Sequence, residues 1–167
     1  PEGPGPEGDT LYYVGTVTTV LRLGPFTVLT DPNFLHRGQR AYLGWGLSSP
    51  RLTDPSLAPE DLPDLDVVLL SHLHGDHFDR VARRRLDRTA PVVTTPHAAR
   101  RLERWGFGTR ALDTWDAHDV TRGLHTLRIT AVPALHARGV MGRLLPPVMG
   151  SVVDHLVAGE LRRRVYV

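Results

Sequence analysis

A short apolar run that leads directly into a cluster of histidines constrains this chain more than any other feature. Residues 67–70 read Val-Val-Leu-Leu, and residues 71–79 read Ser-His-Leu-His-Gly-Asp-His-Phe-Asp. A continuous apolar run of this length is typical of a parallel strand that is buried on both faces. Because ligands gather at the carboxyl ends of such strands, the polar residues that follow are predicted to lie at a functional edge of a sheet.

The pattern after this run alternates between strands and helices. We expect a helix over residues 80–86 with Asp79 as its N-cap, because a side-chain oxygen there can accept hydrogen bonds from the first backbone amides. A strand is predicted over residues 91–95, followed by a helix from the N-cap Thr95 to about Trp105. A strand–helix–strand–helix order implies parallel pairing, and so indicates an α/β fold.

Other segments with strand character lie on both sides of this block. Residues 33–62 form a long polar loop, and a loop of that length is usually functional or mobile. The Pro- and Gly-rich residues 1–9 are expected to be disordered, which leaves one domain over residues 10–167. Further strands are predicted over residues 11–21, 26–30, 124–133, 150–157 and 161–167.

Composition excludes several kinds of chemistry. The chain has no cysteine, which excludes disulfides, thiolate metal ligands and cysteine nucleophiles. All 20 basic residues are arginine, so Schiff-base lysine chemistry is excluded as well. The net charge of +2 is weak evidence for a polyanionic partner. No apolar run approaches the roughly 20 residues of a transmembrane helix, and no signal-peptide pattern opens the sequence, so we expect a cytoplasmic protein.

The histidine cluster has the spacing of a metal site. Residues two apart in an extended segment point the same way, so His72 and His74 can reach one metal together. Gly75 allows a tight turn, after which Asp76 and His77 can face a second metal beside the first. Imidazole and carboxylate donors without thiolate suit zinc, and also manganese or iron. A surface loop of histidines is the alternative, which we disfavour because such a cluster would repel itself if protonated.

The motif His72-x-His74-x-Asp76-His77 after an apolar strand resembles the signature of the metallo-β-lactamase fold superfamily of metal-dependent hydrolases. Residues 29–32, Leu-Thr-Asp-Pro, are similar to that family's early strand ending in Asp. Residues 133–136, Pro-Ala-Leu-His, are similar to the segment that supplies a third histidine. Within the superfamily, the layout is most similar to the N-acyl-phosphatidylethanolamine phospholipase D-like and L-ascorbate-6-phosphate lactonase-like branch.

This resemblance implies a fold and a chemistry. The fold is an α/β sandwich of αββα type, and the activity is zinc-dependent hydrolysis of a phosphodiester or of a lactone or other ester. His72, His74 and His136 would hold the first metal of a pair, and Asp76 and His77 the second. A zinc-activated hydroxide would attack the substrate, with Asp76 orienting it. Asp31 either supports a ligand histidine through a hydrogen bond or is a strand-end turn residue.

The sequence departs from the family pattern at its C-terminal side. The family continues into Gly-Asp-Thr, whose Asp bridges both metals, and a further histidine follows later. We therefore expect a sandwich that is incomplete at this side. One alternative is a non-catalytic fragment that binds a single metal through three histidines. A small-molecule or lipid-like substrate is the expected partner, and the oligomeric state is open.

Several other residues have two interpretations. The apolar residues 139–150 after His136 are either a lid over the site or core. Phe34 and Trp45 either line a substrate pocket or pack the long loop onto the sheet. His97 is expected to be structural, and the remaining histidines to lie at the surface: His36, His118, His125 and His155. A second alternative function, nucleic-acid processing, would use an arginine cluster that lacks interleaved aromatic residues: Arg80, Arg83, Arg84, Arg85 and Arg88.

Overall fold

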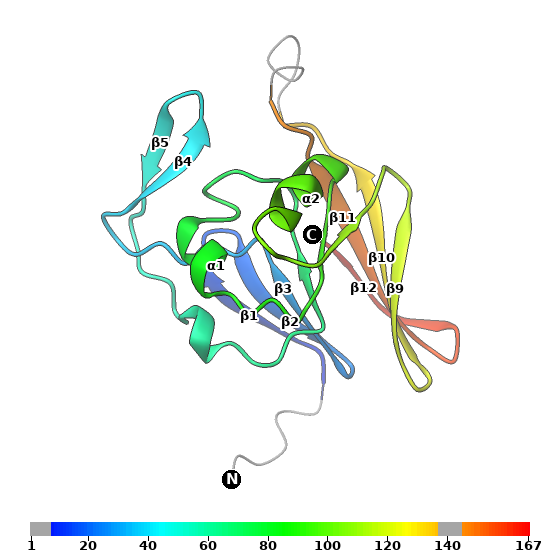
Figure 1. Ribbon diagram of the computed structural model, residues 1–167. Helices are drawn as coiled ribbons and strands as arrows, with labels where there is room; N and C mark the ends of the chain where they lie inside the picture. The colour runs from blue at the N-terminus through cyan, green and yellow to red at the C-terminus, as the bar shows by residue number, and fades with distance from the viewer. Residues whose placement is uncertain (1–7, 137–144) are drawn as a thin grey trace.

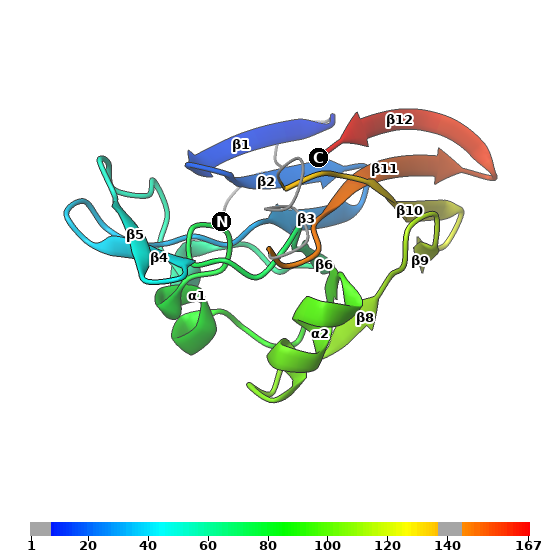
Figure 2. The same cartoon turned by 90° about the horizontal axis from the view of Figure 1, so that it is seen from above.

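Two sheets and one layer of helices make up the fold. The computed structural model describes residues 8–136 and 145–167. Helices α1 (Arg80–Arg85) and α2 (Pro96–Glu103) cover one face of a six-stranded sheet, and a four-stranded sheet packs against the other face (Figures 1 and 2). The described residues therefore form three layers in the order helix, sheet, sheet.

The six-stranded sheet is mixed. Its first three strands form antiparallel pairs, and each pair from β3 onward is parallel. In spatial order the strands are β1 (Thr10–Gly15), β2 (Thr18–Leu23), β3 (Phe26–Thr30), β6 (Val67–Leu69), β7 (Val92–Thr94) and β8 (Thr109–Ala111).

The other strands pair in antiparallel fashion. The four-stranded sheet has the order β12 (Glu160–Tyr166), β11 (Met149–Val157), β10 (His125–Pro133) and β9 (Ala117–Arg122). A separate hairpin consists of β4 (Arg40–Gly44) and β5 (Leu47–Pro50), and a 3₁₀ turn covers Pro59–Asp61.

The position of strand β6 between two layers explains why its sequence is apolar throughout. Successive side chains of a strand point to opposite faces, so a strand between two layers needs apolar residues at every position. Val67 and Leu69 pack between the two sheets, whereas Val68 and Leu70 pack beneath the helices. All four are at most 2% exposed. The predicted buried parallel strand is confirmed, with β3 and β7 as its neighbours.

Two predictions need correction, and two strands were missed. Residues 11–21 form two strands, because Gly15 and Thr16 adopt φ values of 152° and 55° that turn the chain back on itself. Residues 33–62, predicted as a loop, contain the β4–β5 hairpin. Strands β8 and β9 were not predicted. Each has mostly exposed side chains, so neither carries the apolar pattern on which a strand prediction depends.

The expected fourth layer of an αββα sandwich has no counterpart within residues 8–136 and 145–167. The side chains of β12 are mostly exposed on the outer sheet. Residues 1–7 of the predicted disordered segment lie outside the described residues, whereas Asp9 accepts a hydrogen bond from the Gly24 amide at 2.9 Å. In the described part of the chain, no helix is long and apolar enough to cross a membrane.

The predicted N-cap at Asp79 is confirmed. Its Oδ1 accepts hydrogen bonds from the amides of Val81 (2.7 Å) and Ala82 (2.8 Å) at the start of α1. Its Oδ2 accepts one from the amide of Phe34, 45 residues away in sequence. One buried carboxylate therefore both starts α1 and holds the chain that leaves β3.

Replacement of this carboxylate should destabilise the protein. Asp79→Ala removes an N-cap, which costs about 1 kcal/mol, and leaves the buried Phe34 amide without a partner, which costs about 1–3 kcal/mol. We expect the free energy of unfolding to fall by roughly 2–4 kcal/mol, as measured by urea denaturation. Asp64→Ala, at an exposed position, is the control and should change it by less than about 0.5 kcal/mol. Equal effects of the two variants would contradict this role of Asp79.

Candidate metal centre

The histidine motif lies where strands of the two sheets end beside each other. Residues 71–79 follow β6 of the six-stranded sheet, and His136 follows β10 of the four-stranded sheet. The amide of Met149, at the start of β11, donates a hydrogen bond to the carbonyl of Ser71 (3.1 Å). The pairing of β11 with the end of β6 therefore places His136 beside the motif, although at least 59 residues of sequence separate His136 from its histidines.

Three histidines form a first group of donors. One ring nitrogen from each of His72, His74 and His136 lies within 4.8 Å of the other two. His72 Nε2 lies 3.2 Å from His74 Nδ1. The ring centroid of His136 is 4.5 Å from that of His72 and 4.8 Å from that of His74. Three converging imidazoles are a donor set that zinc accepts in catalytic sites.

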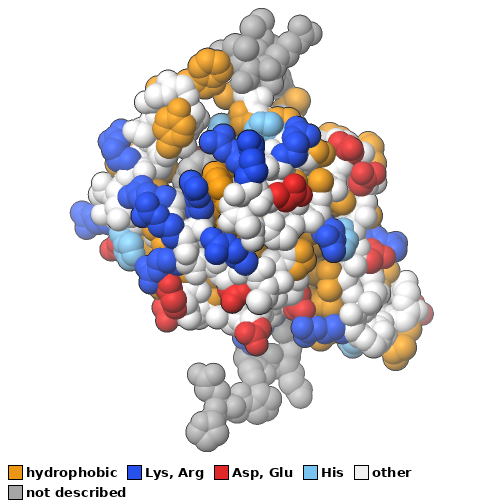
Figure 3. Space-filling model, viewed as in Figure 1, with side chains coloured by type: hydrophobic (Ala, Val, Ile, Leu, Met, Phe, Trp, Pro, Cys, Tyr) orange, Lys and Arg blue, Asp and Glu red, His pale blue; other side chains and the backbone are white. Residues whose placement is uncertain are grey.

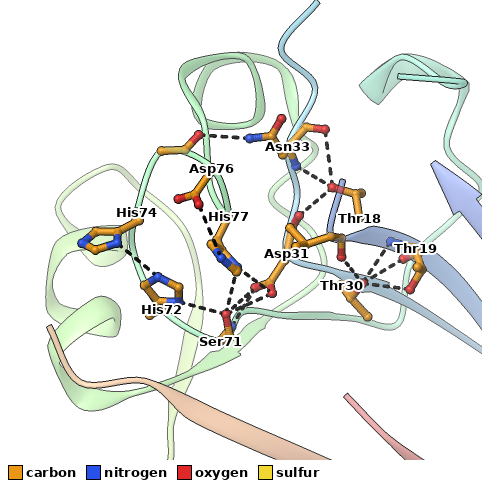
Figure 4. Close-up of polar contacts among 12 residues, drawn as sticks. Thr18, Thr19, Thr30, Asp31, Asn33, Ser71, His72, His74, Asp76 and His77 are labelled. Atoms are coloured by element: carbon orange, nitrogen blue, oxygen red, sulfur yellow. Dashed lines mark hydrogen bonds and ion pairs between the residues drawn. The ribbon is translucent and has the colours of Figure 1, made fainter. Parts of the chain in front are cut away.

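A second group shares one histidine with the first. Ligand atoms of His72, Asp76 and His77 also lie within 4.8 Å of one another. His77 Nε2 is 3.8 Å from a carboxylate oxygen of Asp76, and both side chains point toward the same space (Figure 4). The two groups therefore adjoin at His72, the most buried of the five side chains at 4% exposure.

The carboxylate of Asp31 links the motif to the end of β3. Its Oδ2 lies 2.9 Å from His77 Nδ1, and its Oδ1 accepts a hydrogen bond from the Ser71 amide at 2.8 Å (Figure 4). The Ser71 hydroxyl is 3.0 Å from each oxygen of this carboxylate and 3.1 Å from His72 Nδ1. Because Asp31 and Ser71 engage the Nδ1 atoms, the Nε2 atoms of His72 and His77 are the ones left for a ligand.

Burial and nearby charges shift the pKa values of the histidines in different directions. Burial, together with the nearby imidazoles, lowers the pKa of His72 to about 3, so this ring is neutral at pH 7. Burial also lowers the pKa of His74, with the His136 ring adding to the effect. For His77, burial acts in the same direction, but the hydrogen bond and charge of Asp31 outweigh it and raise the pKa. Neutral imidazole is the form that binds a metal.

One oxygen of the Asp76 carboxylate shows that the residues of the motif fit a metal ion. Asp76 Oδ1 is buried and has no hydrogen-bond partner within the described residues. A buried carboxylate oxygen is costly unless a partner satisfies it, and a cation is such a partner. Beside it stand the neutral ring of His72 and the ring of His77, whose Nε2 lies 3.8 Å from a carboxylate oxygen of Asp76. The donor set therefore fits a divalent metal held by nitrogen and oxygen.

Gly75 lies in the predicted tight turn, in which the amides of His77 (3.1 Å) and Phe78 (2.7 Å) donate hydrogen bonds to the His74 carbonyl. Its φ is not positive, but its amide donates a hydrogen bond to the carbonyl of Tyr42 in β4 at 2.8 Å. A Cβ atom at Gly75 would lie 2.7 Å from that carbonyl oxygen. The close approach of the β4–β5 hairpin therefore excludes a side chain here. On the other side of the loop, the Asn33 amide group donates to the Gly75 carbonyl (3.0 Å).

A cavity of about 590 Å³ adjoins the histidine cluster. His74 and Gly75 line it, as does Trp45 of the hairpin turn, which is 72% exposed. Phe34, in contrast, is 1% exposed and belongs to the core. Of the apolar segment predicted over residues 139–150, residues 139–144 lie outside the described residues, and Pro146 and Pro147 line the cavity.

The structure brings together every residue predicted for the site. His72, His74, Asp76, His77 and His136 form the two donor groups, and Asp31 contacts His77 directly. Sequence reasoning missed Ser71 and Asn33, although each stands next to a predicted feature: the first residue of the motif and the residue after Asp31-Pro32.

Two further histidines are placed differently from expectation. His97, expected to be structural, is exposed and lines the cavity. His155, expected at the surface, is 5% exposed, because its position in β11 turns its ring against the Gly24 backbone and the His125 ring.

Aromatic rings pack against the arginine cluster, although they are not interleaved with it in the sequence. The guanidinium group of Arg83 lies over the Trp105 ring at 4.2 Å, and that of Arg88 lies over the Phe107 ring at 4.9 Å.

Comparison with protein families and curated proteins finds a family and a relative that the chain resembles. Residues 27–167 match the family model described as the beta-lactamase superfamily domain. The N-acyl-phosphatidylethanolamine-hydrolyzing phospholipase D 1 of Caenorhabditis elegans is 27% identical over 136 residues. That match covers 75% of this chain and 37% of the worm protein, so the chain spans little more than a third of this relative's length.

Solved structures resemble the chain over nearly all of its length. An isothiocyanate hydrolase from Delia radicum gut bacteria has a TM-score of 0.72 at 24% identity, covering 93% of this chain and 60% of that one. A possible metal-dependent hydrolase from Veillonella parvula has a TM-score of 0.71 at 23% identity, with coverages of 95% and 62%.

A third structure extends the likeness to a larger protein. CmlA, a diiron β-hydroxylase from Streptomyces venezuelae, has a TM-score of 0.58 at 24% identity, covering 98% of this chain and 30% of that one. At these identities the likenesses show a shared fold, and the expected α/β sandwich is confirmed.

A side chain at Gly75 should disturb the motif. In Gly75→Ala the new Cβ must displace the backbone of Tyr42, and such overpacking costs about 1–3 kcal/mol. We expect a lower free energy of unfolding in urea and weaker metal binding in a competition assay with a coloured chelator. Gly108→Ala is the control, because nothing lies within 4 Å of a Cβ built there. If the two variants behave alike, close packing is not the reason for glycine at position 75.

Proposed function

Because the chain belongs to the beta-lactamase superfamily, whose domain model matches residues 27–167, we propose that the protein is a metal-dependent hydrolase that uses a pair of metal ions. The observation that carries the proposal is the meeting of two donor groups at His72. His72, His74 and His136 would hold the first ion, and Asp76 and His77 the second. The unpartnered, buried oxygen of Asp76 supports this assignment.

The protein's own residues prepare this site in three ways. Burial keeps His72 neutral, so that its Nε2 lone pair is available at pH 7. Asp31 holds His77 Nδ1 and so directs Nε2 toward Asp76. The carboxylate of Asp76 accepts a hydrogen bond from the attacking water and orients it toward the substrate. A divalent metal bound there supplies hydroxide at neutral pH and stabilises negative charge on the attacked group.

Zinc is the metal that we propose, with manganese or iron as alternatives. Imidazole and carboxylate donors without thiolate suit all three ions. A relative in fold, CmlA, is described as a diiron enzyme, which supports iron as the first alternative to test. Elemental analysis of the purified protein distinguishes the three metals, because the donor atoms on their own accept each of these ions.

A phosphodiester, or else a lactone or other ester, is the substrate class that we propose. The relative from Caenorhabditis elegans hydrolyses N-acyl-phosphatidylethanolamine, and this supports a phosphodiester. The first alternative is a non-catalytic chain that binds one metal through three histidines. The second is nucleic-acid processing, which we disfavour, because arginines cover the faces of Trp105 and Phe107 on which bases would stack.

Metal content tests the donor assignment directly. We expect the purified chain to retain bound zinc by elemental analysis, and His72→Ala to lose it, since His72 belongs to both donor groups. His118→Ala is the matched control, because His118 lies on β9 and joins neither group. About two ions per chain would support the pair and one ion the non-catalytic alternative. Unchanged metal content in His72→Ala would contradict the assignment.

Hydrolysis tests the activity. With bis-para-nitrophenyl phosphate and a simple lactone as substrates, we expect turnover that a chelator abolishes and that added zinc restores. His72→Ala and Asp76→Ala should reduce the rate to that of the chelated protein while the circular dichroism spectrum stays unchanged. If either variant remains active at the original rate, the proposed mechanism is wrong.

A further inference from the structure

The lining of the cavity beside the histidine cluster contains a group of basic side chains that are not among the proposed metal ligands. Its lining includes Arg80 and Arg83 of α1, and Arg101 and His97 of α2. The one carboxylate in the lining, Asp79, is buried and already accepts the backbone hydrogen bonds that start α1. In the space-filling view, basic side chains gather over these two helices (Figure 3). With three arginines against this single carboxylate, the lining carries a net positive charge.

Two of these arginines are positioned by aromatic packing. The guanidinium carbon of Arg83 lies 4.2 Å from the centre of the Trp105 ring, and that of Arg101 lies 5.7 Å from it. Trp105 in turn stacks on Phe78, with ring centroids 6.3 Å apart, and Phe78 is 5% exposed. Such cation–π contacts orient a guanidinium but leave its N–H groups free to donate.

The N–H groups of these two arginines are available. Within residues 8–136 and 145–167, neither the Arg83 nor the Arg101 side chain hydrogen-bonds to another group or pairs with a carboxylate. In contrast, the neighbouring Arg85 forms an ion pair with Glu60. Two oriented guanidinium groups without partners match the oxygens of a phosphate or a carboxylate.

The rest of the wall is apolar. Tyr42 and Trp45 come from the β4–β5 hairpin, and Pro146 and Pro147 from the segment before β11. These residues share the lining of one cavity with the arginines and His74. A cavity of about 590 Å³ is within the usual range for sites that bind small molecules.

We propose that Arg83 and Arg101 bind a phosphate or carboxylate group of the substrate that does not react, while an apolar or aromatic part of the same molecule lies against Trp45, Pro146 and Pro147. The orientation of the scissile group toward His74 rests on the proposed function; the binding of the anionic group does not. The substrate class is thereby narrowed to anionic esters or phosphodiesters whose second charge lies apart from the bond that is cleaved.

Binding of small probes to the metal-free protein tests this inference. Metal is removed by a chelator and dialysis, so that an anion cannot bind to an ion at the histidines. Phenyl phosphate and benzoate are the anionic probes, and benzyl alcohol is the neutral one, with affinity measured by NMR titration. We expect both anions to shift the indole N–H signals of Trp45 and Trp105 but not of Trp115, which lies outside the lining. Tighter binding of phenyl phosphate would assign a phosphate, and tighter binding of benzoate a carboxylate.

Matched variants distinguish this site from general attraction. Arg83→Gln and Arg101→Gln should each weaken binding of the anions by about tenfold or more, since each loses a charge-assisted hydrogen bond. Arg100→Gln removes the same charge from α2 at an exposed position outside the lining and should leave the affinity unchanged. Benzyl alcohol should bind equally weakly to all four proteins.

The inference is overturned if Arg100→Gln weakens binding as much as the other two variants, or if the neutral probe binds as tightly as the anions. Its failure and that of the proposed function are separable. A chain that binds the anions through Arg83 and Arg101 but retains no metal refutes the hydrolase proposal alone. A chain that retains metal and hydrolyses esters, with affinities for the anions that do not depend on these arginines, refutes the anion site alone.

Discussion

The hydrogen bonds of the Asp31 carboxylate connect the sheet to the candidate site. Strands β3 and β6 run parallel and end side by side, which places Asp31 next to Ser71 although 40 residues separate them. The buried carboxylate accepts a hydrogen bond from the backbone of Ser71 and contacts a ring nitrogen of His77. A buried carboxylate needs such partners, and these partners orient the histidine motif. The stability of the strand ends and the geometry of the site therefore depend on the same contacts.

The electrostatics of the site follow from its position between buried layers. Burial disfavours protonated imidazole, so His72 and His74 are neutral donors, whereas the charge of Asp31 acts on His77 alone. In the adjoining cavity, Arg83 and Arg101 provide positive charge, and neither forms an ion pair within the described residues. The proposed metals would attract the reacting group and the arginines the other end of the substrate. The histidine motif and the arginines would thus each favour a negatively charged group of the substrate.

Elements whose pattern is local were predicted well. The buried strands and both helix N-caps were predicted correctly, because burial on two faces and amide capping require particular residues within a few positions. Strands β8 and β9 were missed because their side chains are mostly exposed, and backbone pairing alone leaves no apolar pattern. Gly75 was correctly singled out for a tight turn, but the backbone that also excludes a side chain there belongs to the distant residue Tyr42 and could not be predicted locally.

The sequence by itself determined the set of candidate donors, because the side chains at positions 72, 74, 76 and 77 lie within six residues and their spacing follows from backbone geometry. It also determined the buried strand that precedes them. Only the tertiary structure decided which distant groups meet this motif: Asp31 through the parallel pairing of β3 with β6, and His136 through the packing of the second sheet. It likewise decided that Arg83 and Arg101 share one aromatic ring beside the cavity. Such contacts depend on strand order and layer packing, which local residue patterns do not specify.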